Sequence, residues 1–392
     1  MKKFLEKILC SMLVTVFTLS FSVFAETELI SQVNANVTAE IVTAPSALLM
    51  EAASGQVLYE LNADIKLPIA SVTKSMTMLL IMEALDSGKI KLSDKVQTSE
   101  YAASMGGSQI FLEPGEEMTV EEMLKAIAVA SGNDAAVAMA EFVAGGEPAF
   151  VELMNKRAKE LGCKNTHFIN CNGLDETAEH YSTARDVATI SCELLKHPKI
   201  LDYTTIWMDT LRGGEFGLSN TNKLIRFYKG ANGIKTGSTS TAKYCLSASA
   251  KRDGMQLVAV VLAAPSSAER FSSASKLLDY GFANYAVVNA AEKIGEIKPL
   301  SVIGGKTDFV TPVADHKVNF VVKKGNQDKV EVSCTFDEPL RAPLKKNQKI
   351  GSAVLSIEGK KTAVCDILSG EDIERMNVSA MFWKMMQKWM CI

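Results

Sequence analysis

The pattern of apolar and polar positions divides the chain into four parts. Residues 8–24 are mostly apolar and follow three lysines, and a polar stretch rich in threonine and alanine comes next. From about residue 44 to residue 290, short strand-like runs alternate with long helical patterns. Alternating strands separated by polar turns follow, and the last 17 residues have helical spacing. The pattern predicts a leader, a mixed α and β region, a small all-β region and a terminal helix.

The mixed region begins with a predicted hairpin and an apolar helix. Ala47–Glu51 and Gln56–Tyr59 predict two strands around a Ser-Gly turn. Pro68 lies ahead of the helix, where proline is tolerated. The helix is expected over Ser71–Asp86, and its surface is apolar on almost every side. Such a helix is predicted to be central and buried.

Further helices and a pair of strands complete the mixed region. Thr119 and Glu122 form a capping box, which predicts the start of a helix. That helix breaks at Ser131–Asp134, and another is expected over Ala135–Val143. The remaining elements are a helix that begins within Tyr181–Asp186 with Ser182 or Thr183 as its cap, two strands at Cys245–Ala250 and Gln256–Ala263, and a helix over Ser267–Tyr285.

The region after residue 290 predicts a small all-β domain, because short alternating runs are separated by polar turns. Its expected strands are Lys317–Val322, Lys329–Cys334, Ser352–Ile357 and Thr362–Cys365.

The last 17 residues predict an amphipathic helix, whose apolar arc contains Met381, Phe382, Met385, Met386, Trp389, Met390 and Ile392. Lysines interrupt an apolar run that is too short to span a membrane. The helix could lie in the plane of a membrane surface or dock on the protein. Trp, Phe and Met with a rim of lysines favour the membrane surface.

The N-terminus has the pattern of a secretory signal peptide. Three lysines precede the apolar core, and Val23-Phe24-Ala25 is a small-x-small cleavage site. An uncleaved membrane anchor is the alternative, which the short core and Ala25 disfavour. The predicted domains are the signal peptide 1–25, the mixed α and β domain 26–286, the β-sandwich domain 287–375 and the amphipathic anchor helix 376–392.

Charge and cysteine content narrow the function classes. The net charge of −3 offers no basic surface for nucleic acid. Seven dispersed cysteines follow Cys10 of the leader, an odd number that does not form a disulfide framework, although a Cys163–Cys171 bridge stays open. So many thiols in an exported chain hint at a reducing or oxygen-poor habitat. The four histidines show no H-E-x-x-H pattern, so no metal or other cofactor is implied.

Three short motifs carry the candidate chemistry. Ser71 and Lys74 lie three residues apart, so they share a helix face, and burial or a nearby cation could keep the amine neutral enough to take the serine proton. Ser131-x-Asn133 falls at a glycine break between helices, where two caps are the simpler interpretation. Lys235-Thr236-Gly237 would place a cation, a hydroxyl and a close-approach glycine on an edge strand. Together the motifs fit acyl transfer through a serine ester.

These motifs resemble those of serine D-alanyl-D-alanine carboxypeptidases, the low-molecular-mass penicillin-binding proteins. The resemblance extends over most of residues 40–390 and includes Pro68–Thr77, Ser131–Ala136, Phe168–Asp175, Tyr181–Asp186 and Gly233–Thr239, together with the β domain and the amphipathic tail. It implies a β-lactamase/transpeptidase-like α/β (α+β) domain with an antiparallel sheet flanked by helices and a helical insertion carrying Ser131. One departure is Lys243, where relatives usually carry glycine.

The resemblance also implies roles for the motif residues. Ser71 would be the nucleophile and Lys74 the general base, kept neutral by the charge of Lys235. Ser131 would relay a proton to the leaving amine, and Asn133 would hold the substrate amide and help to place Lys74. Lys235 and Thr236 would bind the terminal carboxylate. Gly237 would let the strand approach the substrate closely. The backbone N–H groups of Ser71 and Ser238 would form the oxyanion hole.

The implied function is removal of the terminal D-Ala from peptidoglycan stem pentapeptides during cell wall maturation. β-Lactams would act as inhibitors that leave a slow ester on Ser71. The β domain would act as a stalk and the terminal helix as a peripheral anchor at the outer face of the cytoplasmic membrane, in the periplasm or cell-wall space. The alternatives are a β-lactamase and a non-catalytic peptidoglycan-binding scaffold. No glutamate for fast deacylation can be identified from the sequence, and the complete set of motif residues disfavours a scaffold.

Overall fold

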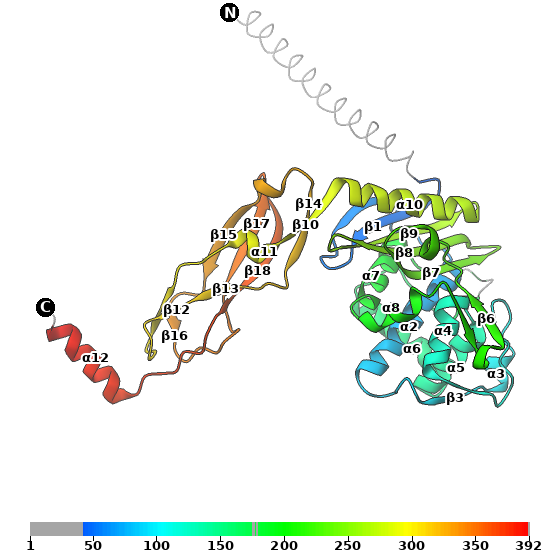
Figure 1. Ribbon diagram of the computed structural model, residues 1–392, viewed down its shortest axis with the longest axis horizontal. Helices are drawn as coiled ribbons and strands as arrows, with labels where there is room; N and C mark the ends of the chain where they lie inside the picture. Colours follow the sequence, from blue (N-terminus) through cyan, green and yellow to red (C-terminus); the bar gives the residue numbers. More distant parts are fainter. Residues whose placement is uncertain (1–41, 175–176, 178, 391–392) are drawn as a thin grey trace, which may run out of the picture. The chain divides into compact units, whose positions relative to one another are not determined.

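The computed structural model of the protein describes residues 42–174, 177 and 179–390. The chain divides into two compact units (Figure 1). The first holds residues 42–49, 59–250 and 258–279, and the second holds residues 50–58, 251–257 and 280–390, as far as they are described. The predicted signal peptide lies outside the described residues. The predicted domain boundary at residue 286 stays a prediction.

The first unit is built around a five-stranded sheet with the order β2-β1-β9-β8-β7. The middles of β8 and β9 are buried on both faces, because helices cover the sheet on both sides. Figure 1 shows α10 along one face and α2 and α7 beneath the other. The strands are β1 (Ser46–Glu51), β2 (Val57–Leu61), β7 (Ala231–Thr239), β8 (Lys243–Arg252) and β9 (Met255–Ala264), and the helices are α2 (Lys74–Asp86), α7 (Ala184–Leu194) and α10 (Ser267–Asn284).

The predicted central helix has two parts. It begins as a 3₁₀ turn, η1 (Ala70–Thr73), and continues as α2, in which ten of thirteen residues are buried. Ser71 therefore lies in the 3₁₀ turn and not in the first α-helical turn. Ala70, just before it, has φ +47°, a left-handed conformation that a non-glycine residue rarely adopts. The sharp turn sets Ser71 at the surface end of a buried helix.

The predicted break at Ser131 is an interruption by a π-helix. The capping box of Thr119 and Glu122 is present, and α4 (Val120–Lys125) passes into the π-helix η2 (Ala126–Ala130). Ser131 then adopts φ +65°, and α5 (Asn133–Ala144) begins two residues later. π-Helical turns are frequent at functional sites. The turn places Ser131 and Asn133 at the junction of two buried helices.

Short elements fill the rest of the first unit. Thr183 caps α7, one of the two caps predicted. The short strand pairs are β3 (Lys95–Gln97) with β4 (Glu117–Thr119) and β5 (Met208–Leu211) with β6 (Phe216–Ser219). The other helices are α3 (Glu100–Ala103), α6 (Glu147–Glu160), η3 (Pro198–Ile200), α8 (Leu201–Thr204), η4 (Arg212–Gly214) and α9 (Leu224–Phe227).

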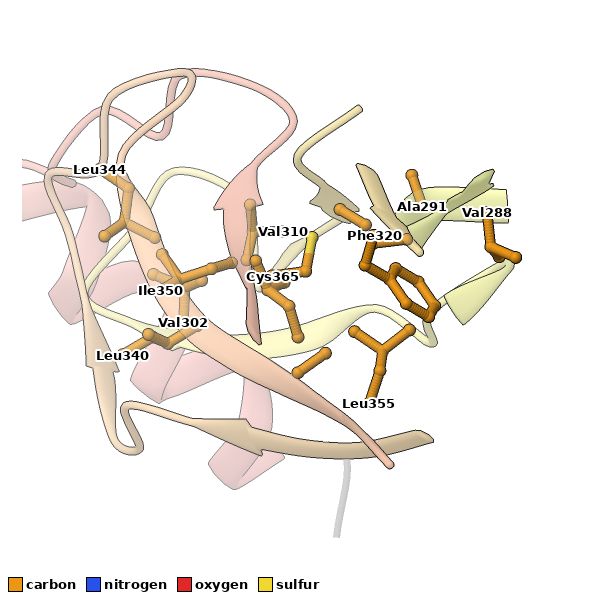
Figure 2. Packing of buried hydrophobic residues seen from close by; sticks show 14 of the residues in the cluster. Val288, Ala291, Val302, Val310, Phe320, Leu340, Leu344, Ile350, Leu355 and Cys365 are labelled. Atoms are coloured by element: carbon orange, nitrogen blue, oxygen red, sulfur yellow. The ribbon is translucent and has the colours of Figure 1, made fainter. Parts of the chain in front are cut away.

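The second unit contains the predicted all-β domain. Its sheets have the orders β10-β14, β12-β11-β16 and β13-β18-β17-β15. Figure 2 shows Phe320, Leu355 and Cys365 among the side chains that fill its interior, all at most 2% exposed. The elements are β10 (Tyr285–Asn289), α11 (Ala290–Ile294), β11 (Leu300–Ile303), β12 (Phe309–Val310), β13 (Pro312–Ala314), β14 (Asn319–Lys323), η5 (Gln327–Lys329), β15 (Glu331–Phe336), β16 (Leu340–Arg341), β17 (Lys349–Ile357) and β18 (Lys360–Ser369).

The predicted terminal helix is α12 (Val378–Met390). Phe382, Trp383 and Trp389 are each at least 60% exposed, whereas Lys384 forms an ion pair with Asp308 of the same unit. Large apolar side chains thus face outward. Among the described residues, no helix has the length and apolar character needed to cross a membrane.

Candidate active site

Ser71 and Lys74 meet as their spacing predicts. The Lys74 Nζ lies 2.9 Å from the Ser71 Oγ, across one turn at the junction of η1 and α2. Lys74 is fully buried, whereas Ser71 is only partly covered. The hydroxyl can therefore be reached from outside while the amine beside it is shielded from water.

Two further acceptors hold the Lys74 amine in place. The Asn133 Oδ1 accepts from it at 2.5 Å, and the backbone carbonyl of Asn172 accepts at 2.9 Å. Asn133 is itself fixed, because its Nδ2 donates to the Gly106 carbonyl at 2.7 Å. Residues from three distant parts of the sequence thus set the position of one nitrogen atom.

Asp134 supports the Asn133 contact from the next position of α5. Its carboxylate accepts from the backbone N–H groups of Ile110 and Leu112 at 3.0 and 3.1 Å. Arg212 donates to the Ile110 carbonyl at 2.9 Å from the other side. The segment that carries the Gly106 carbonyl is therefore held by a buried carboxylate and a guanidinium.

Gly173 allows the Asn172 loop to pack on the nucleophile turn. A Cβ at Gly173 would lie 2.0 Å from the Ala70 carbonyl oxygen, and the residue has φ +81°. Both the contact and the conformation require glycine. The loop that supplies the Asn172 carbonyl therefore lies directly against the residue before Ser71.

Gly237 allows strand β7 to pack closely against the same nucleophile turn. A Cβ there would lie 2.6 Å from the Ile69 carbonyl oxygen and 2.9 Å from the Ser71 nitrogen. The sequence predicted that this glycine allows a close approach to substrate. The close approach that the structure contains is between β7 and the turn of Ser71. The Lys235-Thr236-Gly237 motif is thereby brought to the nucleophile on the edge strand, where it was predicted.

The polar groups of β7 form a basic end of the site. Lys235 is 1% exposed, and its Nζ donates to the Thr236 carbonyl at 3.0 Å. The Thr236 hydroxyl donates to the Thr221 Oγ1 at 2.7 Å. Arg270 from α10 is also buried and donates to the Gly237 carbonyl at 3.1 Å. A buried amine, a buried guanidinium and two hydroxyls therefore surround this end of β7.

Burial is the main cause of the lysine pKa values. It lowers the pKa of Lys74 from 10.5 to about 7, while Cys171 and Asp134 oppose the shift. Burial also lowers the pKa of Lys235 well below its ordinary value, with smaller contributions from the charges of Lys74 and Arg270. The charge of Lys235 was predicted to keep Lys74 neutral. This prediction is wrong about the main cause, because burial of the amine lowers the pKa of Lys74 the most.

The remaining predicted site residues, Ser131 and Ser238, adjoin Asn133 and Gly237 along the chain. Ser131 is 3% exposed in the turn between η2 and α5, and Ser238 is exposed on β7 directly after Gly237. Asp175, at the end of one matching stretch, lies outside the described residues. Sequence reasoning assigned no role to Asn172, Thr221 or Arg270. The Asn-Gly turn at residue 172 was the only local signal for any of these three.

Cys163, Cys171 and His180 are buried in the first unit. Cys163 and Cys171 are unpaired, so the bridge left open by their spacing is absent. His180 is buried beside the nucleophile turn, with its Nε2 2.7 Å from the Thr73 Oγ1. The described residues contain no cluster of three or more His, Cys, Asp or Glu arranged to hold a metal ion.

Comparisons with known proteins agree with the motif pattern. Residues 32–266 match the family model described as D-alanyl-D-alanine carboxypeptidase, peptidase S11, and residues 285–375 match the C-terminal domain of penicillin-binding protein 5. The chain is 47% identical over 350 residues to D-alanyl-D-alanine carboxypeptidase DacF of Bacillus subtilis, covering 88% of this chain and 90% of the relative.

Solved structures give the same result. Penicillin-binding protein 5 of Haemophilus influenzae is 34% identical, with a TM-score of 0.74 over 85% of this chain and 98% of that one. A peptidoglycan synthesis regulatory factor, PBP3, of Streptococcus pneumoniae is 27% identical, with a TM-score of 0.75 over 85% of this chain and all of the other. The resemblance found from the motifs is confirmed, and the predicted fold class with it. The chain belongs to the peptidase S11 family of D-alanyl-D-alanine carboxypeptidases and carries the C-terminal domain of penicillin-binding protein 5.

Proposed function

We propose that the protein removes the terminal D-Ala from peptidoglycan stem pentapeptides through an acyl-enzyme on Ser71. The observation that carries this proposal is the buried Lys74 amine, 2.9 Å from a reachable serine hydroxyl. A serine needs an adjacent base to become a nucleophile, and the base needs a pKa near the working pH. A lysine whose pKa burial lowers to about 7 meets that requirement.

The hydrogen bonds of Lys74 support its role as the base. A neutral amine has two N–H groups and one lone pair. The Asn133 Oδ1 and the Asn172 carbonyl accept both N–H groups, which directs the lone pair toward the Ser71 hydroxyl. After proton transfer, the ammonium donates to all three oxygens. Both protonation states are therefore satisfied without movement of the side chain.

The β7 end of the site supports recognition of the substrate C-terminus. Lys235 and the Thr236 hydroxyl would bind the terminal carboxylate, a charge-assisted contact that also raises the pKa of Lys235 when substrate arrives. Arg270 holds the Gly237 carbonyl and adds positive charge behind the strand. The N–H groups of Ser71 and Ser238 would receive the oxyanion, which is worth about 3–4 kcal/mol per donor in the transition state.

Ser131 and Asn133 would complete the reaction. Ser131 would pass a proton to the leaving D-Ala amine, and it lies at the turn two residues before Asn133. Asn133 keeps Lys74 in position and would present its amide to the substrate backbone. Water then hydrolyses the ester on Ser71. A β-lactam would acylate the same oxygen.

The reaction is tested with a pentapeptide that ends in D-Ala-D-Ala. We expect the purified protein to release one equivalent of D-alanine and to leave a tetrapeptide, which mass spectrometry and a D-amino acid assay both detect. The alternative peptide ending in L-Ala-L-Ala should stay intact. No release from the D-Ala-D-Ala peptide would contradict the proposed function.

The pKa of Lys74 predicts the pH dependence of acylation. The neutral amine is the active form, so kcat/KM should rise with pH through about 7 and level off above it. An unshifted lysine would instead make the rate rise toward pH 10. Asn133→Asp places a carboxylate on the same nitrogen, which favours the ammonium and should move the rise upward by about one pH unit or more. Initial rates between pH 5 and 9 measure both profiles. If kcat/KM rises at the same pH in Asn133→Asp as in wild type, the proposed role of Lys74 is contradicted.

We further propose that the protein is exported and binds the outer face of the cytoplasmic membrane through α12. The exposed aromatic and Met side chains of this helix support in-plane binding, since they would otherwise face water. The ion pair of Lys384 with Asp308 holds one lysine of the helix against the second unit. The second unit would then act as the stalk that carries the catalytic unit.

Deletion of residues 376–392 tests the anchor. We expect the shortened protein to leave the membrane fraction and to keep its rate of D-Ala release within about twofold, because the catalytic residues belong to the other unit. Centrifugation of the protein with anionic and neutral vesicles measures the binding. Retained vesicle binding after the deletion would contradict the anchor.

A further inference from the structure

A polar cavity continues the site beyond the oxyanion end of β7. It has a volume of about 370 Å³ and is lined by Ser238, Thr239, Ser240, Lys243, Tyr244 and Pro265. Hydroxyl groups and one ammonium group make up its polar lining, and no carboxylate belongs to it. The chemistry of these groups suits an anion.

The direction of the substrate along β7 places this cavity on the acyl side. The terminal carboxylate would lie at Lys235 and Thr236, and the scissile carbonyl would lie at Ser238. A strand advances about 3.3 Å per residue. The substrate residue just before the acyl D-Ala therefore comes to lie opposite Thr239 and Ser240, beside the cavity.

Lys243 is the unusual residue of the cavity. It has φ +55°, a conformation that glycine adopts freely and that lysine adopts at a cost. Its side chain is exposed, and it has no hydrogen bond or ion pair with the part of the chain that the structure describes. The fold therefore holds an unpaired cation at a strained position on the rim of a cavity that adjoins the reaction centre.

We propose that this cavity is a subsite for the third residue of the stem peptide and selects a side chain that ends in a carboxylate. The proposal rests on the proposed function, because it uses the substrate direction given there. Lys243 pairs with the side-chain carboxylate, and the hydroxyls of Ser240 and Tyr244 are placed to donate to it. A neutral or purely cationic side chain at that position gains no such contact.

Two pentapeptides that differ in one charge test the subsite. Both contain meso-diaminopimelate at position three and end in D-Ala-D-Ala, and in one of them the side-chain carboxylate is amidated. We expect kcat/KM for the free acid to be about three- to tenfold higher than for the amide, the range of a partly exposed charge-assisted pair. The ratio should fall as salt is raised from 20 mM to 500 mM.

Variants assign the preference to Lys243. Lys243→Gln should bring the ratio close to one, and Lys243→Arg should keep it above one. Lys159→Gln removes an exposed lysine of α6 that does not line the cavity, and it should leave the wild-type ratio unchanged. The thermal melting temperature of each variant reports whether it is folded.

The outcomes separate the subsite from the reaction itself. The subsite would be overturned if wild type had equal kcat/KM for the acid and the amide, or if Lys243→Gln kept the wild-type ratio. In either case, D-Ala release from both peptides would still support the proposed function. The comparison of the two peptides with wild type needs no variant. It therefore still decides the question if Lys243→Gln fails to fold. Release from neither peptide would overturn both proposals.

Discussion

Replacing Ser71 by alanine is expected to lower D-Ala release by roughly 10⁴-fold or more, because Ser71 supplies the hydroxyl that forms the ester. Labelling by a fluorescent penicillin should disappear with it. The assay compares D-Ala release and gel fluorescence for wild type and Ser71→Ala at equal concentration. A variant that still becomes labelled would contradict the assignment of the nucleophile. A label that wild type loses within seconds would instead indicate a β-lactamase.

Ser75 offers a matched control for this substitution. It lies one turn further along α2, is buried, and its hydroxyl has no partner among the described residues. Ser75→Ala removes the same type of atom one turn away and should leave D-Ala release within about twofold of wild type. A large loss in both variants would mean that helix packing, and not the nucleophile, determines the result.

Gly173→Ala is expected to have the second largest effect. The new Cβ would lie 2.0 Å from the Ala70 carbonyl oxygen and 2.7 Å from the Thr73 Oγ1, so the Asn172 loop or the nucleophile turn must move. Displacement of catalytic groups by about 1 Å can cost about 100-fold in rate. We expect kcat/KM to fall by about that factor and the free energy of unfolding to fall by roughly 3 kcal/mol, from overpacking and left-handed strain together.

Gly162→Ala separates the two contributions. Gly162 has φ +78°, close to the +81° of Gly173, but a Cβ there would have no atom within 4 Å. It should lose about 1 kcal/mol of unfolding free energy from backbone strain alone and keep its full activity. Urea denaturation and initial rates of both variants give the comparison. Equal losses in the two would show that contact with Ala70 does not matter.

The sequence predicted the regular elements well, because their signals are local. The Thr119–Glu122 capping box, the cap at Thr183 and the hairpin between β8 and β9 all occur where local chemistry placed them. The π-helix before Ser131 and the left-handed conformation of Ala70 were not predicted. Both depend on packing against distant segments, which propensity and periodicity do not report.

The motif residues could be found from the sequence, whereas much of their support could not. Ser71 and Lys74 are joined by helix spacing, which a sequence displays directly. The Asn172 carbonyl is a backbone group, so the residue type carries no signal for its contact with Lys74. Arg270 reaches β7 from a helix that follows later in the chain, and nothing in its local pattern distinguishes it from a surface arginine. The source of the Lys74 pKa shift likewise depends on burial, which only the fold establishes.

The residue that carries a covalent β-lactam adduct identifies the nucleophile. The protein is incubated with benzylpenicillin, quenched with acid, digested with trypsin and sequenced by mass spectrometry. We expect the added mass on the peptide Leu67–Lys74, with fragment ions that assign it to Ser71 and not to Thr73. The same adduct should form far more slowly in Lys74→Ala. An adduct on a peptide that lacks Ser71, or no adduct at all, would show that Ser71 is not the nucleophile.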